Sequence, residues 1–412
     1  MTQHLMPVEQ ALSRMLAMTP VVHATESLPL LEAMGHVLAR DIYASVNVPP
    51  ADNSAMDGYA LRLADAGAPL PVSQRVAAGQ APEPLKPGTC ARIFTGAEIP
   101  AGADLVVMQE AVRFTAFEDV VVPDDLVSGQ NIRPAGQDIR QGDCVLQAGI
   151  RLDYRHLGLL ASIGIAQVEV FRRVRVAILS TGDELVMPGQ TLQPGQIYNS
   201  NRYLLQGFLQ QMGAEVVSFA QVPDCYEMTL TALRQAAEQA DLIISTGGVS
   251  VGEEDHVKPA VEALGHLSLW KLAMKPGKPV AFGQIGSSLF LGLPGNPVST
   301  FVGAQVFVTP VLAKLSGQSS GERLCLSGTV DFSATARIRQ EYLRVQAEWI
   351  EDHWRLSAFP NQNSGVLTSA IRCNALAILP PDTRVEPGDR LTFWLYDDRP
   401  SPSPSPSPSH DL

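Results

Sequence analysis

The sequence predicts a multi-domain protein in which a central doubly wound α/β domain is joined to a β-rich inserted domain and a small C-terminal β-barrel. The chain has 412 residues, enough for several domains at about 100–200 residues each. Continuous apolar runs alternate with helical patterns only between about 174 and 320. The flanking stretches are rich in turns, in a chain with 31 Pro and 33 Gly.

The α/β prediction rests on two strands with two helices between them. VRVAILS (174–180) and DLIIST (241–246) are continuous apolar runs, typical of strands buried on both faces. One predicted helix begins at Asn199 and ends at Gly213; the other begins at Asp224. This alternation of strand and helix predicts a mainly parallel sheet.

The remaining stretches complete the domain organisation. Apolar residues at helical spacing predict a helix over 8–19, and EDH (351–353) predicts a hairpin turn between two strands. The Ser/Pro tail holds no apolar side chain before Leu412, so it cannot bury a core and is expected to be disordered. The predicted domains are an N-terminal linking domain (1–49 plus 140–173), an inserted domain (50–139), the α/β domain (174–322), a β-barrel (323–398) and the tail (399–412).

Composition excludes several classes of function. A net charge of −12 argues against nucleic-acid binding, so an anionic ligand must be held by local Lys, Arg or backbone N–H groups. The five cysteines are scattered without a C-x-x-C spacing, which supports neither a disulfide framework nor a zinc site. The N-terminus has no apolar signal region, and no apolar run of 18 residues is seen. We therefore expect a cytoplasmic protein without membrane contact.

Two loops with the same sequence predict a ligand crevice. Ser-Thr-Gly occurs at 180–182 and again at 245–247, each time directly after a buried strand. In open α/β sheets, ligands bind beyond the carboxyl ends of the strands. Thr181, Gly182 and Gly247 are therefore expected to border one crevice.

The acidic residues of the first loop and of the nearby helix start have two interpretations. Asp183 and Glu184 place carboxylates at the strand end, although Asp183 can also cap a short helix. Asp224, with Glu227 three residues later, fits a capping box better than a catalytic role when judged from its surroundings alone.

The second loop, TGGVSVGEED (246–255), is typical of a phosphate cradle. Gly247, Gly248 and Ser250 can present backbone N–H groups at the start of a helix. Glu253, Glu254 and Asp255 would repel a phosphate unless Mg²⁺ bridges them to it. Capping of the following helix by Asp255 explains the same residue equally well.

Three lysines in LWKLAMKPGKP (269–279) stand out in an acidic chain. On a strand, Lys271 and Lys275 share one face, and Lys278 follows a Pro-Gly turn. These ammonium groups suit an oxyanion or a pyrophosphate, whereas the alternative is an edge strand protected by lysines. The nearby loop LPGNPVS (293–299) is stiffened by Pro294 and Pro297, and its Asn296 and Ser299 can cap the helix that follows.

In the inserted domain, SAMDGYA (54–60), IFTGA (93–97) and RPAGQDIR (133–140) are polar loop sequences. Each is an ordinary turn in isolation. No spacing argument brings Asp57, Thr95 or Asp138 near the α/β crevice.

In combination, the motifs carry more information. SAMDGYA, FTGA, STGDEL, TGGVSVG, KPGKP and LPGNPVS occur in the order found in the molybdopterin molybdenumtransferase family, which includes bacterial MoeA and the E domain of gephyrin. The chain resembles this family over roughly residues 5–398. The resemblance implies a homodimer whose site is shared, so that the inserted domain of one chain completes the crevice of the other.

The resemblance also implies which residues form the site. Two differences from the family's usual sequence, at Gln137 and at Glu253-Glu254, keep the Asp that follows each of them. Arg344 in EYLRV and Ser364 in NQNSG are weaker matches. The site residues carried over by motif are Asp57, Thr95, Asp138, Glu184, Asp224, Asp255, Lys271, Lys275, Pro294, Pro297, Arg344 and Ser364.

By resemblance, the chain would insert molybdate into adenylylated molybdopterin, with Mg²⁺-dependent release of AMP. Asp255 and Glu184 would hold Mg²⁺, and Lys271 and Lys275 would hold molybdate. Asp57, Asp138, Glu184 and Asp224 are the candidates for proton transfer. Expected partners are the molybdopterin adenylyltransferase and a recipient molybdoenzyme or its chaperone. Two alternatives stay open, a nucleotide pyrophosphatase on the same α/β domain and a non-catalytic scaffold.

Overall fold

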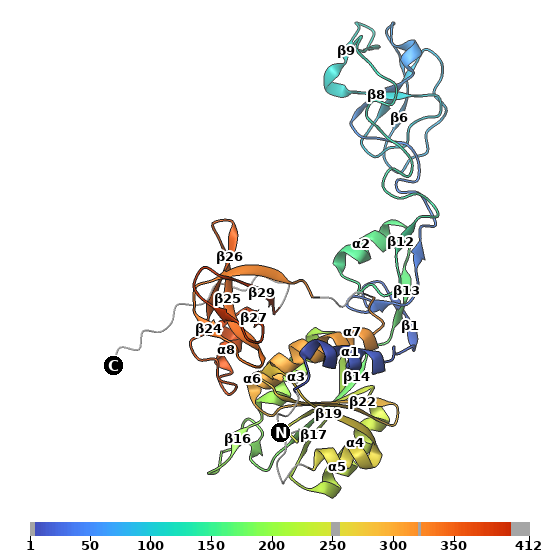
Figure 1. The fold of residues 1–412 in the computed structure, drawn as a ribbon. Helices are drawn as coiled ribbons and strands as arrows, with labels where there is room; N and C mark the ends of the chain where they lie inside the picture. Colours follow the sequence, from blue (N-terminus) through green and yellow to red (C-terminus); the bar gives the residue numbers. More distant parts are fainter. Residues whose placement is uncertain (1–4, 249–255, 320–322, 397–412) are drawn as a thin grey trace. The chain divides into compact units, whose positions relative to one another are not determined.

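The computed structural model describes residues 5–248, 256–319 and 323–396. The chain divides into two compact units, one made of Met1–Glu26 with Phe171–Leu412 and the other of Ser27–Val170 (Figure 1). The α/β domain and the C-terminal barrel belong to the first unit.

The centre of the first unit is a six-stranded sheet. Its first four strands are parallel, because α3 (Ser200–Gln211) and α4 (Tyr226–Gln239) carry the chain back between them. Only β21 runs the other way: a tight turn at Gly286 joins it to β22 as an antiparallel hairpin, and β19 pairs with it antiparallel on its other side. In sheet order the strands are β17 (Glu215–Val222), β14 (Arg175–Thr181), β18 (Leu242–Thr246), β22 (Ser288–Leu293), β21 (Pro279–Ile285) and β19 (Gly265–Lys271). The predicted doubly wound, mainly parallel sheet is confirmed.

Helices cover both faces of this sheet, as Figure 1 shows. On one face, α4 and α5 (Val257–Leu264) bury Leu233 and Val261 against the strands. On the other lie α3, the predicted N-terminal helix α1 (Val8–Met18), and a continuous helical stretch made of α6 (Pro297–Gly303), a π-turn (Ala304–Val308) and α7 (Thr309–Leu315). Both faces of the strands are therefore core, which explains their uninterrupted apolar sequences.

The helical stretch Pro297–Leu315 is long and largely apolar. An 18-residue window of this 19-residue helix has a mean hydropathy of 1.5, which is enough, by length and composition, to cross a membrane. In the fold, 78% of that window is buried inside the protein, as in the core helix of a globular domain. Gln305, Thr309 and Lys314 interrupt its apolar residues, so the sequence shows no uninterrupted apolar run here.

Of the residues considered as helix caps, Asn199 is confirmed, whereas Asp224, Asp183 and Asn296 do not cap a helix. Asn199 caps α3 by accepting from the N–H of Arg202 at 3.2 Å. Helix α4 begins one residue later than predicted, with Cys225 at the cap and no side-chain capping, because the chain turns at Pro223. Asp224 instead donates its N–H to the Asp183 carboxylate at 3.1 Å. Asp183 therefore joins two loops and caps no helix; β15 (Leu185–Val186) follows it. Asn296, at the start of α6, also makes no side-chain cap.

The predicted strand across 269–275 is two strands. β19 ends at Lys271, and β20 (Met274–Lys275) pairs with β25 of the barrel. The predicted apolar face holds, since Trp270, Leu272 and Met274 are all buried. The chain changes sheets here and so joins the α/β domain to the barrel.

Five strands of the C-terminal part close into a barrel, because β27 pairs with both β29 and β25. Around the barrel they are β25 (Gln340–Ile350), β26 (His353–Ala358), β23 (Leu326–Val330), β29 (Arg390–Leu395) and β27 (Ala375–Leu379). The predicted hairpin is confirmed, with Glu351 and Asp352 at φ of 47° and 64° as a tight right-twisted turn requires. Helix α8 (Thr368–Arg372) and the pair β24 (Ala334–Thr335) and β28 (Arg384–Val385) lie beside it.

The second unit contains the β-rich insertion. A four-stranded sheet of β6 (Val72–Val76), β7 (Cys90–Ile93), β5 (Gly58–Leu61) and β8 (Leu105–Met108) has a small apolar core on each face. A three-stranded sheet of β1 (Thr25–Pro29), β13 (Gln167–Phe171) and β2 (Val37–Leu38) has its own core with Leu38 and Leu160. This unit also contains three two-stranded sheets: β3 (Ile42–Tyr43) with β12 (Cys144–Leu146), β4 (Asn53–Ser54) with β11 (Ile132–Arg133), and β9 (Arg113–Phe114) with β10 (Val120–Val121). In the first unit, β15 pairs with β16 (Ile197–Tyr198).

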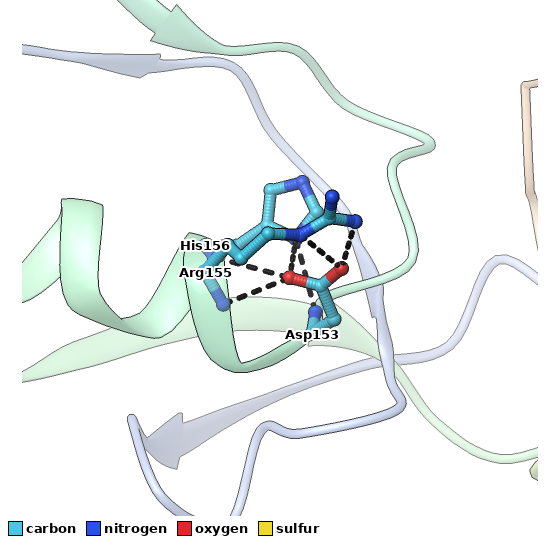
Figure 2. Close-up of polar contacts among 3 residues, drawn as sticks. All are labelled: Asp153, Arg155 and His156. Atoms are coloured by element: carbon cyan, nitrogen blue, oxygen red, sulfur yellow. Dashed lines mark hydrogen bonds and ion pairs between the residues drawn. The ribbon is translucent and has the colours of Figure 1, made fainter.

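Helix α2 (Tyr154–Ser162) of the second unit begins with a complete capping box (Figure 2). The Asp153 carboxylate accepts from the N–H groups of Arg155 and His156 at 2.9 and 3.3 Å, and His156 Nδ1 accepts from the Asp153 N–H at 3.0 Å. The Arg155 guanidinium adds a further bond, so the pKa of Asp153 lies well below its usual value. The cap satisfies the first N–H groups of the helix.

Candidate active site

The predicted crevice lies at the carboxyl ends of β14, β18 and β22. Ser180 is the register partner of Thr246, which is in turn the partner of Leu293, so the loops that follow these strands begin side by side. The hydroxyls of Ser180 and Thr246 are 3.2 Å apart, and Gly247 donates its N–H to the Leu293 carbonyl at 3.1 Å. The two Ser-Thr-Gly loops therefore border one site, as predicted.

A cavity of about 500 Å³ opens between the loops that follow β18 and β22 and the barrel. The sequence predicted six of the residues that line it: Gly247, Gly248, Lys275, Lys278, Pro294 and Ser364. Others were not assigned to the site, among them Arg339, Gln362 and Asn363 from the barrel and Ser299 from α6.

Cations dominate the charge of this cavity. Lys275 is half-exposed and forms an ion pair with Glu341, whose carboxylate oxygens are 3.0 and 3.1 Å from Nζ. The side chains of Lys278 and Arg339 make no ion pair or hydrogen bond with any described residue. Two cations without a counter-charge among the described residues, in a chain of net charge −12, favour binding of an anion here.

The glycine loop approaches its neighbours too closely for any side chain. A Cβ on Gly248 would lie 2.2 Å from Val257 Cγ2, and one on Gly247 would lie 3.0 Å from Thr181 Oγ1. Both residues also have positive φ, at 63° and 91°. The loop thus packs against the first turn of α5 and against the end of β14 while its backbone borders the cavity.

A second cavity, of about 360 Å³, adjoins the first, since Gly247, Gly295 and Asn296 line both. Thr181, Glu184 and Pro297 line it, as predicted. Glu184 is exposed, its carboxylate makes no hydrogen bond with a described residue, and it lies over Gly182, where a Cβ would be 2.3 Å from its Oε2. Asn201 lines this cavity as well and holds the adjoining loop by donating from Nδ2 to the Gly295 carbonyl at 2.6 Å.

Four predicted residues of the first unit line neither cavity: Gly182, Lys271, Asp224 and Arg344. Lys271 ends β19 opposite Pro279, and Asp224 lies in the turn before α4. Arg344 is only 1% exposed; it donates to Ser369 Oγ at 3.1 Å and to the Asn363 carbonyl at 3.3 Å. Arg344 therefore supports the loop that carries Asn363 and Ser364 and does not face the cavity, and its burial lowers its pKa.

The predicted residues Ser250 and Asp255 lie outside the described residues, as do Glu253 and Glu254. Asp57, Thr95 and Asp138 belong to the other unit. There, one carboxylate oxygen of Asp57 accepts both the N–H and the O–H of Thr95, each at 2.8 Å. These two bonds hold the pKa of Asp57 below its ordinary value. Asp138 is exposed, and its N–H donates to the Val48 carbonyl.

The described residues include no group of three or more His, Cys, Asp or Glu arranged to hold a metal ion. Mg²⁺ nevertheless binds through one or two carboxylates together with phosphate oxygens of a substrate. Glu184 supplies one free carboxylate beside the glycine loop, so the described donors fit a substrate-assisted Mg²⁺ site.

Comparison with known proteins identifies the family. Three family models match in order: the MoeA N-terminal region (domain I and II) over residues 6–164, a probable molybdopterin binding domain over 177–314, and the MoeA C-terminal region (domain IV) over 332–396. The molybdopterin molybdenumtransferase of Haemophilus influenzae is 43% identical over 322 residues, covering 77% of this chain and 80% of that protein. The chain belongs to the molybdopterin molybdenumtransferase family.

Other members of the molybdopterin molybdenumtransferase family match as widely. Molybdopterin molybdenumtransferase 2 of Mycobacterium tuberculosis is 36% identical over 386 residues, covering 89% of this chain and 94% of that protein. The crystal structure of the molybdopterin biosynthesis moeA protein of Pyrococcus horikoshii OT3 covers 95% of this chain with a TM-score of 0.83 at 29% identity, and all of that chain is matched. The predicted family and fold class are confirmed.

Proposed function

We propose that this protein inserts molybdate into adenylylated molybdopterin and releases AMP in a Mg²⁺-dependent reaction. The observation that carries the proposal is the cavity of about 500 Å³ beside a glycine loop at the strand ends, which contains two cations, Lys278 and Arg339, that no described carboxylate pairs with. A compact dianion and a pyrophosphate both match that chemistry. Membership of a family whose members are named for molybdenum transfer to molybdopterin supports the choice of substrate.

The cavity residues divide into positioning roles. Lys275, Lys278 and the backbone N–H groups of Gly247 and Gly248 would bind the anionic groups and hold them in place for reaction. Ser364 and the rigid Pro294 loop border the same space. Because Lys271 and Arg344 line neither cavity, Lys278 and Arg339 replace them in this proposal.

The second cavity provides the acid–base and metal chemistry. Glu184 is the free carboxylate at its edge, and with Asp255 it would hold Mg²⁺, which when bound supplies positive charge to a phosphoryl group. Asp57 and Asp138 are the proposed proton-transfer groups of the other unit, together with Thr95 as a substrate contact. Asp224 stays a candidate for proton transfer, although its backbone contact with Asp183 shows only a role in joining loops.

These roles require that Asp57, Thr95 and Asp138 lie next to substrate bound in a crevice of an α/β domain. We therefore propose a homodimer in which the second unit of one chain completes the crevice of its partner. A molybdopterin adenylyltransferase would supply the substrate, and a molybdoenzyme or its chaperone would receive the product. Neither nucleic acid nor a membrane is part of the proposal.

Binding of molybdate tests the anion site directly. The Lys278→Gln variant should bind molybdate about tenfold more weakly in equilibrium dialysis, because one charge-assisted contact contributes about 1.5–3 kcal/mol. Lys86→Gln, which removes an exposed lysine of the other unit, is the matched control and should bind like the unaltered protein. Equal affinities for all three proteins would exclude this cavity as the molybdate site.

Two other functions make different predictions. A pyrophosphatase on the same α/β domain would release AMP at a rate that does not depend on molybdate. A scaffold would release none. An enzyme is favoured by the cations Lys278 and Arg339 in the first cavity and the carboxylate of Glu184 in the second, because a scaffold that only binds a partner does not require these groups.

A further inference from the structure

Two arginines contact one phenylalanine ring on an exposed part of the second unit. Arg75 on β6 and Arg92 on β7 are register partners, and Tyr59 on β5 is the partner of Arg92 on the other side. The guanidinium carbons of Arg75 and Arg92 lie 4.5 and 4.6 Å from the centroid of the Phe94 ring. Arg92 also lies 5.1 Å from the Tyr59 ring. Each of these contacts is a cation–π interaction.

The two arginines differ in what else they contact. Arg92 is half-buried and anchored, since it donates to the Gly58 carbonyl at 2.9 Å and to Gln109 Oε1 at 2.5 Å. Arg75 is exposed, and its side chain makes no hydrogen bond or ion pair with a described residue. Its guanidinium is oriented by the ring, while its N–H donors stay available to a ligand.

The arrangement places two like charges on one ring, and no carboxylate among the described residues pairs with Arg75. Like charges repel, so the cluster is favourable only if an anion or solvent screens it. The residue after Phe94 is Thr95, which bonds to Asp57. The guanidinium of Arg75 therefore contacts the residue next to Thr95, one of the two residues of this unit that are proposed to reach the substrate.

We infer that Arg75 binds a phosphate group of the nucleotide half of the substrate, and that Phe94 and Arg92 are the residues that position it. A guanidinium presents a planar fork of donors that matches two phosphate oxygens, which an ammonium does not. The inference deepens the proposed function and rests on it for the identity of the nucleotide. The phosphate-binding part stands on the arginine geometry alone.

Binding of inorganic pyrophosphate and of AMP to the full-length chain tests the inference. Titration calorimetry with Arg75→Gln should show affinity roughly tenfold lower for both ligands, the loss expected for one charged, bidentate contact. Arg75→Lys keeps the charge but loses the fork, so its affinity should fall between the two. Arg113→Gln removes an exposed arginine of β9 in the same unit and should change nothing. Equal affinities for Arg75→Gln and the unaltered protein, or equal losses in Arg75→Gln and Arg113→Gln, would overturn the inference.

A second variant separates orientation from charge. Phe94→Leu keeps both arginines and removes the ring, so pyrophosphate affinity should fall although no charge is lost. An unchanged pyrophosphate affinity would overturn the positioning role of Phe94.

Failure of the proposed function would give a different result. If the unaltered chain binds pyrophosphate through Arg75 but releases no AMP from adenylylated molybdopterin, the phosphate site holds and the proposed reaction does not.

Discussion

Lys275 and Lys278 are three residues apart, yet the fold gives them different surroundings. Lys275 is neutralised by Glu341 of the barrel, and Lys278 has no such partner among the described residues. Their spacing predicted a shared anion site, which the cavity supports. The ion pair was not predictable, because Glu341 lies on a strand that pairs with Lys275 only after the barrel has packed against the α/β domain.

This ion pair leads to a testable prediction. Glu341→Gln removes the charge that compensates Lys275, so molybdate should bind several-fold more tightly as the local field becomes more positive. Equilibrium dialysis at two ionic strengths measures the effect, which salt should weaken. Glu348→Gln, an exposed change further along β25, is the control. Weaker or unchanged binding in Glu341→Gln would mean that the pair fixes the position of Lys275 more than it masks its charge.

Gly248 provides a second prediction for a single residue. Gly248→Ala should destabilise the protein and weaken anion binding, because the new Cβ would meet Val257 at 2.2 Å. Gly286→Ala is a close control: its φ of 59° matches the 63° of Gly248, but nothing lies within 4 Å of its Cβ. The control should lose about 1 kcal/mol of unfolding free energy from backbone strain alone. Urea denaturation compares the two variants, and equal losses would contradict the packing argument.

Among the elements, β14 and β18 were predictable because a strand covered on both faces must be apolar throughout. The break between β19 and β20 could not be predicted from the sequence. Both sides of that break keep the alternation of buried residues, so the pattern alone cannot show that the chain changes sheets. The role of Arg344 was misjudged for a related reason, since its motif marks the strand while its contacts depend on the neighbouring Asn363 loop.

The starts of β14 and β18 are joined by an ion pair whose effect depends on pH. Arg172 donates to both carboxylate oxygens of Asp241 at 2.8 Å, and the N–H of Arg175 donates to one of them. Burial alone would raise the pKa of Asp241, but these hydrogen bonds and charges outweigh it and lower the pKa. The ionised carboxylate therefore stabilises the fold above the unfolded-state pKa of about 4, and this stabilisation is lost as the pH falls through the lower folded-state pKa.

Asp241→Asn should accordingly destabilise the protein at neutral pH by about 1–2 kcal/mol. The difference from the unaltered protein should shrink as the pH falls below about 4. Chemical denaturation followed by circular dichroism at several pH values measures both effects. A difference that stayed constant from pH 7 to pH 3 would show that the carboxylate charge does not contribute.

At the scale of the whole molecule, the order of motifs predicted more than any single motif. No feature of Asp57 or Thr95 alone indicates a site, and their mutual bonds appear only in the folded unit. Arg339 was not predicted as a site residue, because it lines the cavity from the barrel and the local sequence does not show where the barrel packs. Residues whose role depends on packing between domains were the ones that sequence reasoning missed.

The proposed shared site predicts that two inactive chains complement each other. Asp57→Asn and Lys278→Gln disable different units, so a mixture that exchanges subunits should form some dimers with one intact site. For random exchange, half of the dimers are mixed, and about a quarter of all sites are intact. Activity near that fraction supports the shared dimer. A mixture as inactive as either variant, despite exchange confirmed by mass spectrometry, would mean that each chain completes its own site.

The central claim is that one site couples release of AMP to transfer of molybdenum. The most direct measurement is a reaction of the purified chain with adenylylated molybdopterin, molybdate and Mg²⁺ in which AMP and pterin-bound molybdenum are quantified together. We predict that the two appear in equal amounts, that removal of molybdate or Mg²⁺ suppresses both, and that Lys278→Gln lowers both in parallel. Release of AMP at full rate without molybdate, or without molybdenum bound to the pterin, would contradict the account.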